Sequence, residues 1–271
     1  MNSLIDIDKL ERTSRRLSAT ELSEVFKYVK ERVITQKSKP EKDQWEKYWE
    51  EMLNSGQDHP SFFLKKRFQN IYRLNGSFAE INGDTVCVSV LQEILSKINS
   101  LYLKDCDFLV EFGSGTGSNI KYISELNQNI SSFGSDFSES SLGILKRKGL
   151  NSFFFDMKNP SLSSLPKIVQ ENLNRTAFLT SGSMEQLGDA WRNFVDFVLE
   201  VKPSKIINIE PIYEYYDDSE FDSLARQFHL NKKYFSGYVN FLKDKKIHLI
   251  EHRHKFGTLF DEGFNTIITS P

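Results

Sequence analysis

An acidic residue and three glycines stand within seven positions of the sequence, in the segment Glu-Phe-Gly-Ser-Gly-Thr-Gly from Glu111 to Gly117. Glycine weakens a regular strand or helix by roughly 0.5–1 kcal/mol relative to alanine, so three glycines in so short a segment indicate a special local requirement. Either the chain turns there in a conformation that glycine adopts most easily, or a ligand lies directly against the backbone. The segment joins the apolar run DFLVEF to the helix-like SNIKYISEL, which predicts a turn between a strand and a helix.

Two common nucleotide-binding loops differ from this segment. The dinucleotide pattern G-x-G-x-x-G needs its third glycine one position after Gly117, and the phosphate-binding P-loop needs a Gly-Lys-Ser/Thr ending that is absent here. A carboxylate two residues before Gly113 would repel a pyrophosphate, but it suits a ligand that carries an ammonium and a sulfonium group. A purely structural turn and a dinucleotide site remain as alternatives, and the sequence favours the site for a cationic ligand.

Two further acids follow the next two strand-like runs. In FGSDFS the second predicted strand ends at Asp136, and in FFFDM the third predicted strand ends at Asp156 and Met157. Each aspartate alone could be a helix cap, because aspartate is favoured at that position. Their order after successive strands indicates a single ligand site.

The glycine segment and these two acids together resemble the motifs of class I S-adenosylmethionine-dependent methyltransferases, whose first motif is E/D-x-G-x-G-x-G. The resemblance covers about Asp107 to Pro271 and implies S-adenosyl-L-methionine as the cofactor. It implies that Asp136 hydrogen-bonds both ribose hydroxyls, and that Asp156 reads the adenine amino group while Met157 packs on the ring. The predicted cofactor-binding residues are Glu111, Gly113, Ser114, Gly115, Gly117, Asn119, Asp136, Phe137, Asp156, Met157 and Ser181.

The elements that must position these residues alternate between strand and helix from residue 107 onward. At the carboxy terminus, the runs KIHLIEHRHKF and FNTIITSP leave no room for a helix between them and predict an antiparallel hairpin, as in the seventh strand of the family. The predicted fold class is α/β, a Rossmann-like seven-stranded mostly parallel sheet with an antiparallel terminal hairpin, plus an all-helical N-terminal region. The strand-like runs are DFLVEF, SSFGSDF, NSFFFDM, TAFLTSGS and SKIINIEP.

The first 75 residues have the pattern of helices only. Helices are predicted over 18–34, 38–53 and 60–74, and a fourth over 84–103. The first two begin with capping-box patterns, Ser18 to Glu21 and Ser38 to Glu41.

This pattern divides the chain into two predicted parts. We expect residues 1–75 to form a helical N-terminal cover and residues 76–271 to form a class I methyltransferase domain. The segment of about 217–246, between the fifth and sixth strands, is expected to be an insertion over the active site.

The sequence indicates the methyl acceptor less clearly. No Asn/Asp-Pro-Pro-Tyr-type motif follows the fourth strand, and neither cysteine lies where a cytosine-methylating nucleophile would be, which disfavours methylation of nucleic-acid bases. We expect O-methylation of a hydroxylated metabolite or sugar; N-methylation of a small amine or amino acid, or a non-catalytic S-adenosylmethionine-binding partner module, are the alternatives. Ligands of such sheets lie outside the carboxyl ends of the strands. The predicted substrate residues are Met184, Gln186, Glu210, Tyr213, Tyr215, Tyr234 and Tyr238.

A hydroxyl acceptor must lose its proton, and a group with a pKa near neutrality removes it best. Of the five histidines, His229 alone falls in the insertion expected to cover the strand ends. We therefore predict His229 as general base, with Glu185, just after the fourth strand, orienting the histidine or the substrate.

Composition limits the partners. The chain has 271 residues and a formal net charge of −2, without the strongly basic stretch that marks a nucleic-acid-binding domain. No apolar run approaches the ~18–20 residues of a membrane span, and neither cysteine has a metal-ligand spacing. We expect a cytoplasmic monomer or homodimer with a small-molecule substrate, and no metal, nucleic acid or membrane partner.

Overall fold

The computed structural model describes residues 3–35, 40–56, 68–83 and 85–271. Within these residues, the largest element is a seven-stranded sheet with the order β6-β5-β4-β7-β8-β11-β9. Its strands are β4 (Phe108–Phe112), β5 (Ser131–Asp136), β6 (Asn151–Phe154), β7 (Thr176–Ser181), β8 (Lys205–Ile209), β9 (Leu249–His252) and β11 (Thr266–Thr269).

Most neighbouring strands of this sheet are parallel. β4 pairs in parallel with both β5 and β7, and β6 and β8 extend the parallel sheet on either side. β11 is antiparallel to β8 and to β9, so the predicted terminal hairpin is confirmed. This arrangement, in which the antiparallel strand β11 lies between β8 and β9, is the Rossmann-like, mostly parallel sheet with a terminal hairpin that the sequence predicted.

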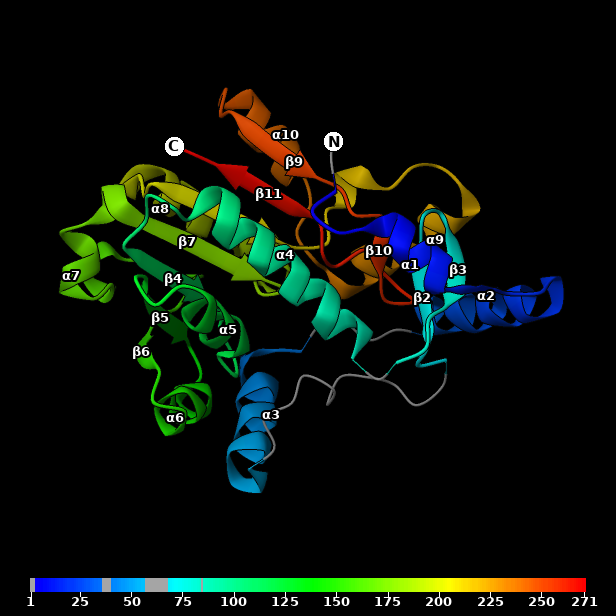
Figure 1. The fold of residues 1–271 in the computed structure, drawn as a ribbon, viewed down its shortest axis with the longest axis horizontal. Coiled ribbons are helices and arrows are strands. Elements are labelled where there is room, and N and C mark those ends of the chain that lie inside the picture. Colours follow the sequence, from blue (N-terminus) through cyan, green and yellow to red (C-terminus); the bar gives the residue numbers. More distant parts are fainter. Residues whose placement is uncertain (1–2, 36–39, 57–67, 84) are drawn as a thin grey trace.

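Helices cover both faces of the sheet (Figure 1). The period-2 alternation of the strands produces this arrangement: Leu109 packs into one core and Val110 into the other. The core of Leu109 is closed by α4 (Val86–Tyr102), α5 (Ser118–Leu126) and α6 (Glu139–Arg147). The core of Val110 is closed by α7 (Lys167–Gln170), α8 (Trp191–Val201) and α10 (Tyr238–Asp244). Short 3-10 helices complete these connections at η2 (Leu162–Ser164), η3 (Leu173–Arg175), η4 (Met184–Ala190) and η5 (Tyr213–Tyr215).

The N-terminal region is not purely helical, which corrects one expectation. It contains α1 (Ile7–Thr13), α2 (Ala19–Ile34) and α3 (Lys42–Ser55), but also two strands of a second sheet with the order β1-β3-β2-β10. The strands of this sheet are β1 (Arg15–Arg16), β2 (Ile71–Leu74), β3 (Ser77–Glu80) and β10 (Phe256–Gly257). The expected boundary after residue 75 therefore falls in the turn of the β2–β3 hairpin, and the C-terminal chain supplies the fourth strand.

The predicted helices have different outcomes. The helix over 18–34 is confirmed as α2, with the capping box of Ser18 and Glu21, and the helix over 84–103 is confirmed as α4. The second helix begins at Lys42, with Glu41 as its N-cap and Gln44 as its capping-box partner; Ser38 lies outside the described residues. The helix predicted over 60–74 is a strand at 71–74 and otherwise falls largely on residues that are not described.

The expected insertion and the helix α3 lie in different places. α9 (Glu220–Lys232) packs against α2 beside the small sheet, whereas α3 packs against α6 near the strands β5 and β6 (Figure 1). Thus two helices of the N-terminal region have different partners, α2 packing against the insertion and α3 against α6.

Candidate functional site

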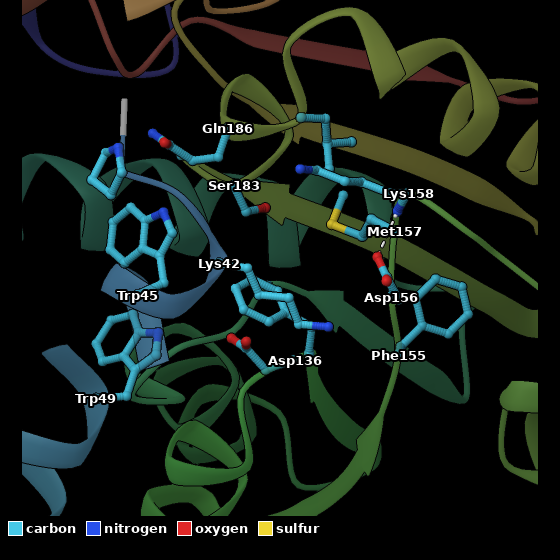
Figure 2. Close-up of a pocket in the computed structure, with 15 residues that line it drawn as sticks. Lys42, Trp45, Trp49, Asp136, Phe155, Asp156, Met157, Lys158, Ser183 and Gln186 are labelled. Carbon is cyan, nitrogen blue, oxygen red and sulfur yellow. Dashed lines mark hydrogen bonds between the residues drawn. The ribbon is translucent and has the colours of Figure 1, made fainter. Parts of the chain in front are cut away.

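A pocket opens at the carboxyl ends of the central parallel strands (Figure 2). The chain moves outward from β4 through β5 to β6 and then returns to β7 on the other side of β4. At such a reversal the loops after two adjacent strands leave in opposite directions and open a crevice. Three residues of these two loops line the pocket: Gly113 follows β4, and Gly182 and Ser183 follow β7.

The three glycines of the first loop allow a backbone conformation that other residues rarely adopt. Gly113, Gly115 and Gly117 all have positive φ, at 67°, 51° and 71°. This backbone conformation is unfavourable for residues that carry a Cβ atom. A Cβ at Gly115 would lie 2.9 Å from Cη2 of Trp49, so this glycine faces a side chain of α3. Gly115 and Gly117 are not among the residues that line the pocket, and Gly113 is.

Glu111 lies beneath this loop. Its side chain is 1% exposed, and its Oε1 accepts a 2.7 Å hydrogen bond from Nδ2 of Asn119 in the first turn of α5. Burial raises the pKa of Glu111 to about 8, against the opposing effect of the Asn119 hydrogen bond. Glu111 Oε2 has no hydrogen-bond partner among the described residues, so one buried acceptor is left available under the loop.

Asp136, at the end of β5, faces the pocket and also holds the glycine loop in place (Figure 2). Its Oδ2 accepts from the backbone N–H of Gly115 at 3.1 Å, and its Oδ1 accepts from that of Ser138 at 3.0 Å. Burial raises the pKa of Asp136 above its ordinary value, although both N–H groups favour the charged form. A carboxylate has about four lone-pair sites, so Asp136 can still accept from a ligand.

The far end of the pocket, on the right in Figure 2, is formed by residues that follow β6. Phe155 and Met157 are buried apolar side chains at 2% and 6% exposure. Asp156 accepts from the backbone N–H of Lys158 at 2.9 Å through Oδ1, which fixes its direction. This end combines apolar surface with one carboxylate.

Helix α3 forms the opposite wall of the pocket. Trp45 and Trp49, one helical turn apart, lie parallel with their ring centroids 5.8 Å apart and their planes 20° apart, and both line the pocket. Lys42, in the first turn of the same helix, lies with its Nζ 5.3 Å above the ring of Phe137. Ser140 at the start of α6 donates its backbone N–H to Oε1 of Glu46, which helps to hold α3 in position.

The loop after β7 is held by a buried carboxylate. Glu210, 0% exposed, accepts from the backbone N–H groups of Ser183, Met184 and Glu185 at 3.2, 3.0 and 3.3 Å. The loop thereby presents Ser183 and Gln186 to the pocket. Burial raises the pKa of Glu210, and a backbone hydrogen bond from Met184 opposes this shift.

Glu185 lies directly behind this loop. Its Oε1 accepts from Nε2 of the pocket residue Gln186 at 2.7 Å, and the side chain of Tyr234 also hydrogen-bonds it. Burial and the nearby carboxylate of Glu210 raise the pKa of Glu185 well above its ordinary value. A carboxyl pKa shifted upward in this way moves toward the range in which general acid–base catalysis is efficient.

His229 does not face the pocket, which corrects the prediction that it is the general base. It is 0% exposed, and its Nε2 hydrogen-bonds the carbonyl oxygen of Phe235. Its ring is enclosed by Tyr213, Tyr234 and Phe235. Burial lowers its pKa to about 4, so the residue is neutral and part of the packing of the insertion.

Several predicted substrate residues also have structural contacts instead of pocket positions. Tyr238 donates to Oδ1 of Asn208 at 2.5 Å within the core, and Tyr215 donates to Oε2 of Glu251 at 2.8 Å. Met184 is 0% exposed. Of the predicted substrate residues, Gln186 alone lines the pocket that the structure describes.

The predicted cofactor residues divide in two groups. Gly113, Asp136, Phe137, Asp156 and Met157 line the pocket. The others do not line it; these are Glu111, Ser114, Gly115, Gly117, Asn119 and Ser181.

The pocket side chains of α3 were not predicted from the sequence. Trp45 and Trp49 have the i, i+4 spacing of one helical face, which is also the pattern of an ordinary amphipathic helix. Two tryptophans on one face were the available signal, but spacing alone does not tell a core from a pocket wall. The missed pocket residues are Pro40, Lys42, Trp45, Trp49, Phe155, Lys158, Gly182 and Leu187.

Two features are absent from the part of the chain that the structure describes. No three His, Cys, Asp or Glu side chains in this part of the chain gather as ligands of a metal ion. No helix that the structure describes has the length and apolar character needed to cross a membrane.

Comparisons with known proteins give similarity at the level of structure. No protein-family model and no curated protein sequence matches the chain. The CurJ carbon methyltransferase is 12% identical with a TM-score of 0.47, covering 70% of this chain and 55% of its own. Human N-acetylserotonin methyltransferase in complex with SAM is 11% identical with a TM-score of 0.47, covering 68% of this chain and 54% of its own. PigF with SAH is 14% identical with a TM-score of 0.47, covering 92% of this chain and 70% of its own.

The chain thus spans about half the length of the first two of these proteins. Similarity at such identities and TM-scores gives no information on activity or substrate. The assignment of the fold rests on the strand order of the chain itself.

Proposed function

We propose that this chain is an S-adenosyl-L-methionine-dependent methyltransferase that acts on a polar small molecule. The observation that carries the proposal is the gathering of five predicted cofactor residues, from the ends of three successive parallel strands, in one pocket. These residues are Gly113, Asp136, Phe137, Asp156 and Met157. The pocket has a cavity volume of about 130 Å³ and is partly open to solvent.

The side chains fit the chemistry of this cofactor. Asp136 supplies a buried, oriented carboxylate for the ribose hydroxyls, and the apolar surface of Phe137 and Met157 suits the adenine. The unpartnered Oε2 of Glu111 provides an acceptor near the loop where the amino-acid end would lie. When bound, S-adenosylmethionine would supply an electrophilic methyl group on a sulfonium that is already a good leaving group.

The chain's own residues would then have three tasks. The loop after β7, fixed by Glu210, would orient an acceptor through Ser183 and Gln186, and orientation of two reactants is worth several kcal/mol. Helix α3 would exclude water from the pocket. Glu185, hydrogen-bonded to Gln186, is the proposed general base for a hydroxyl acceptor, in place of His229.

An amine acceptor is the second candidate, and one observation favours it. The carboxyl groups of Glu210 and Asp261 both interact electrostatically with that of Glu185, so the region behind the loop is acidic. A carboxylate that is ionised in this region would attract a protonated amine. N-methylation would then compete with O-methylation as the reaction of this site.

Incubation with methyl-labelled S-adenosylmethionine and fractionated metabolites of the source cell tests the proposal. We expect one labelled small-molecule product, whose chemical identification decides between an oxygen and a nitrogen acceptor. The Glu185→Gln variant should form that product at least about a hundredfold more slowly, since general base catalysis typically contributes ~10²–10⁴-fold. Cofactor binding without any labelled product from any fraction would instead indicate a non-catalytic binding module.

A further inference from the structure

Resting on the proposed function, the arrangement of the pocket gives a direction to the bound cofactor. Asp156 and Met157 form one end, Asp136 lies between, and the tryptophan pair of α3, Trp45 and Trp49, forms the other end (Figure 2). With adenine at the first end and ribose at Asp136, the sulfonium would lie between Asp136 and the tryptophan pair.

The sulfonium end of the pocket is short of negative charge. Among the described residues that line the pocket, the carboxylates are Asp136 and Asp156, which the ribose and adenine would use. Ser183 and Gln186 are neutral, and Lys42 is positive. A permanently positive sulfonium placed there would lose hydration without gaining an anionic partner, which is costly.

The tryptophan pair offers the missing partner. An indole ring attracts a cation over its face more strongly than the other aromatic side chains do. Close packing holds the pair in position. Cη2 of Trp49 lies 2.9 Å from the point where a Cβ on Gly115 would stand, and the two rings are stacked. α3 itself is held on α6 by the hydrogen bonds Ser140 N to Glu46 Oε1, at 3.1 Å, and Arg147 Nη1 to Leu53 O, at 2.6 Å.

We propose that Trp45 and Trp49 recognise the positive charge of the sulfonium by cation–π interaction. The pair would then discriminate the charged cofactor from its neutral demethylated product, S-adenosylhomocysteine. The two compounds share the adenosine and amino-acid groups, so interactions at Asp136 and Asp156 cannot provide this discrimination. A site of this kind would favour release of the product after each turnover.

Isothermal titration calorimetry of the full chain with each compound tests this proposal. Trp45→Leu and Trp49→Leu should raise the Kd for S-adenosylmethionine about two- to thirtyfold more than the Kd for S-adenosylhomocysteine, which corresponds to the usual range of cation–π interactions. Trp45→Phe and Trp49→Phe should retain part of the discrimination. Tyr28→Leu, which removes an aromatic ring from α2 outside the pocket, should change neither Kd.

Fluorinated tryptophan incorporated into the wild-type sequence provides a second measurement that leaves the shape of the pair intact. Stepwise fluorination should weaken binding of S-adenosylmethionine stepwise and leave binding of S-adenosylhomocysteine unchanged. The third tryptophan, Trp191, is 2% exposed in the core and does not line the pocket. Equal changes in both Kd values, in either experiment, would overturn the cation–π proposal, whereas failure of the wild type to bind either compound would overturn the proposed function itself.

Discussion

Glu111 and Asp136 are both buried carboxyl groups next to the glycine loop, but their partners differ. Glu111 accepts from Asn119 and supports the start of α5, whereas Asp136 accepts from two backbone N–H groups and faces the pocket. The sequence motifs predicted both residues as part of the site next to the glycine loop. They do not indicate which of the two side chains a ligand would contact, because that depends on the direction in which each side chain points in the folded protein.

The pH dependence of folding stability should report the state of Glu111. Its folded pKa is raised to about 8 from an ordinary value of 4.5, so the folded protein binds the proton more tightly than the unfolded chain. This contribution to stability is fully present below pH 4.5 and is lost as the pH rises through 8. The free energy of unfolding of the wild type should therefore fall, relative to that of Glu111→Gln, as the pH rises from 4.5 to about 8, by at most about 1.4 kcal/mol per pH unit.

Urea denaturation of both proteins across that range measures the difference. Parallel stability curves for the wild type and Glu111→Gln would mean that Glu111 has an ordinary pKa and that its burial does not determine its charge.

Residue types alone predicted the acceptor side of the site poorly, for a physical reason. Tyr238 and Glu210 stand where the sequence places them, beyond strand ends, but a tyrosine hydroxyl or a carboxylate is equally suited to core hydrogen bonds. Tyr238 bonds Asn208, and Glu210 bonds three backbone N–H groups, so both stabilise the scaffold. Their partners are far away in the sequence, and no local pattern identifies them.

At the scale of elements, the mostly parallel sheet was predictable and the position of α3 was not. The parallel sheet follows from alternating strand and helix patterns, and its terminal hairpin from a connection too short for a helix. The location of α3 depends on its contact with α6, where Leu53 Cδ2 would lie 3.0 Å from a Cβ on Gly143. A contact between two helices so distant in the sequence leaves no signature in either helix.

This contact offers a test of how α3 contributes to the pocket. Gly143→Leu should displace α3 from α6 and weaken S-adenosylmethionine binding about tenfold or more, because Trp45 and Trp49 would move with the helix. Adding Leu53→Ala should restore part of the affinity by making room. Lys146→Leu, an exposed position on α6, is the control.

Calorimetric titration of these variants distinguishes the possibilities. Unchanged affinity in Gly143→Leu, with circular dichroism showing a folded protein, would contradict a role for docked α3 in the site.

At the scale of the whole molecule, the N-terminal region is part of the cores and not a detachable cover. Ile5, at 5% exposure, packs in the main core with residues of α4, and Val29, at 0%, packs in the core of α2 with Phe221. The small sheet joins β1 near the N-terminus to β10 near the C-terminus. A truncation of residues 1–55 would therefore remove core residues together with the pocket wall of α3.

Cooperative unfolding should follow from this shared packing. Val29→Ala should lower the free energy of unfolding by about 2 kcal/mol, through lost burial and the cavity left behind, and should shift a single transition. Thermal unfolding followed by tryptophan fluorescence and by circular dichroism checks this expectation. A separate early transition in Val29→Ala, with the remaining structure unchanged, would show that the N-terminal region folds independently.

His254 connects the two ends of the chain and should make the protein sensitive to acid. Its Nδ1 bonds Ser3 Oγ at 3.0 Å and its Nε2 bonds Thr266 Oγ1 at 3.2 Å. Burial, with a smaller effect of His252, lowers its pKa to about 3. Because the unfolded histidine titrates near 6.5, the stability that this neutral residue contributes is present above pH 6.5 and is lost as the pH falls toward 3. Denaturation at pH 7 and pH 5 should show a smaller loss of stability in His254→Gln than in the wild type; an equal loss would contradict the assignment.

The most direct test of the central proposal is calorimetric titration of the wild type and Asp136→Asn with S-adenosylhomocysteine. The wild type should bind one molecule per chain, and Asp136→Asn should bind about ten- to a hundredfold more weakly, since hydrogen bonds to a charged group are worth roughly 1.5–3 kcal/mol. Asp107→Asn, an exposed acid at the opposite end of the sheet, should bind as the wild type does. Absence of binding to the wild type, or equal affinity in Asp136→Asn, would contradict a cofactor site in this pocket.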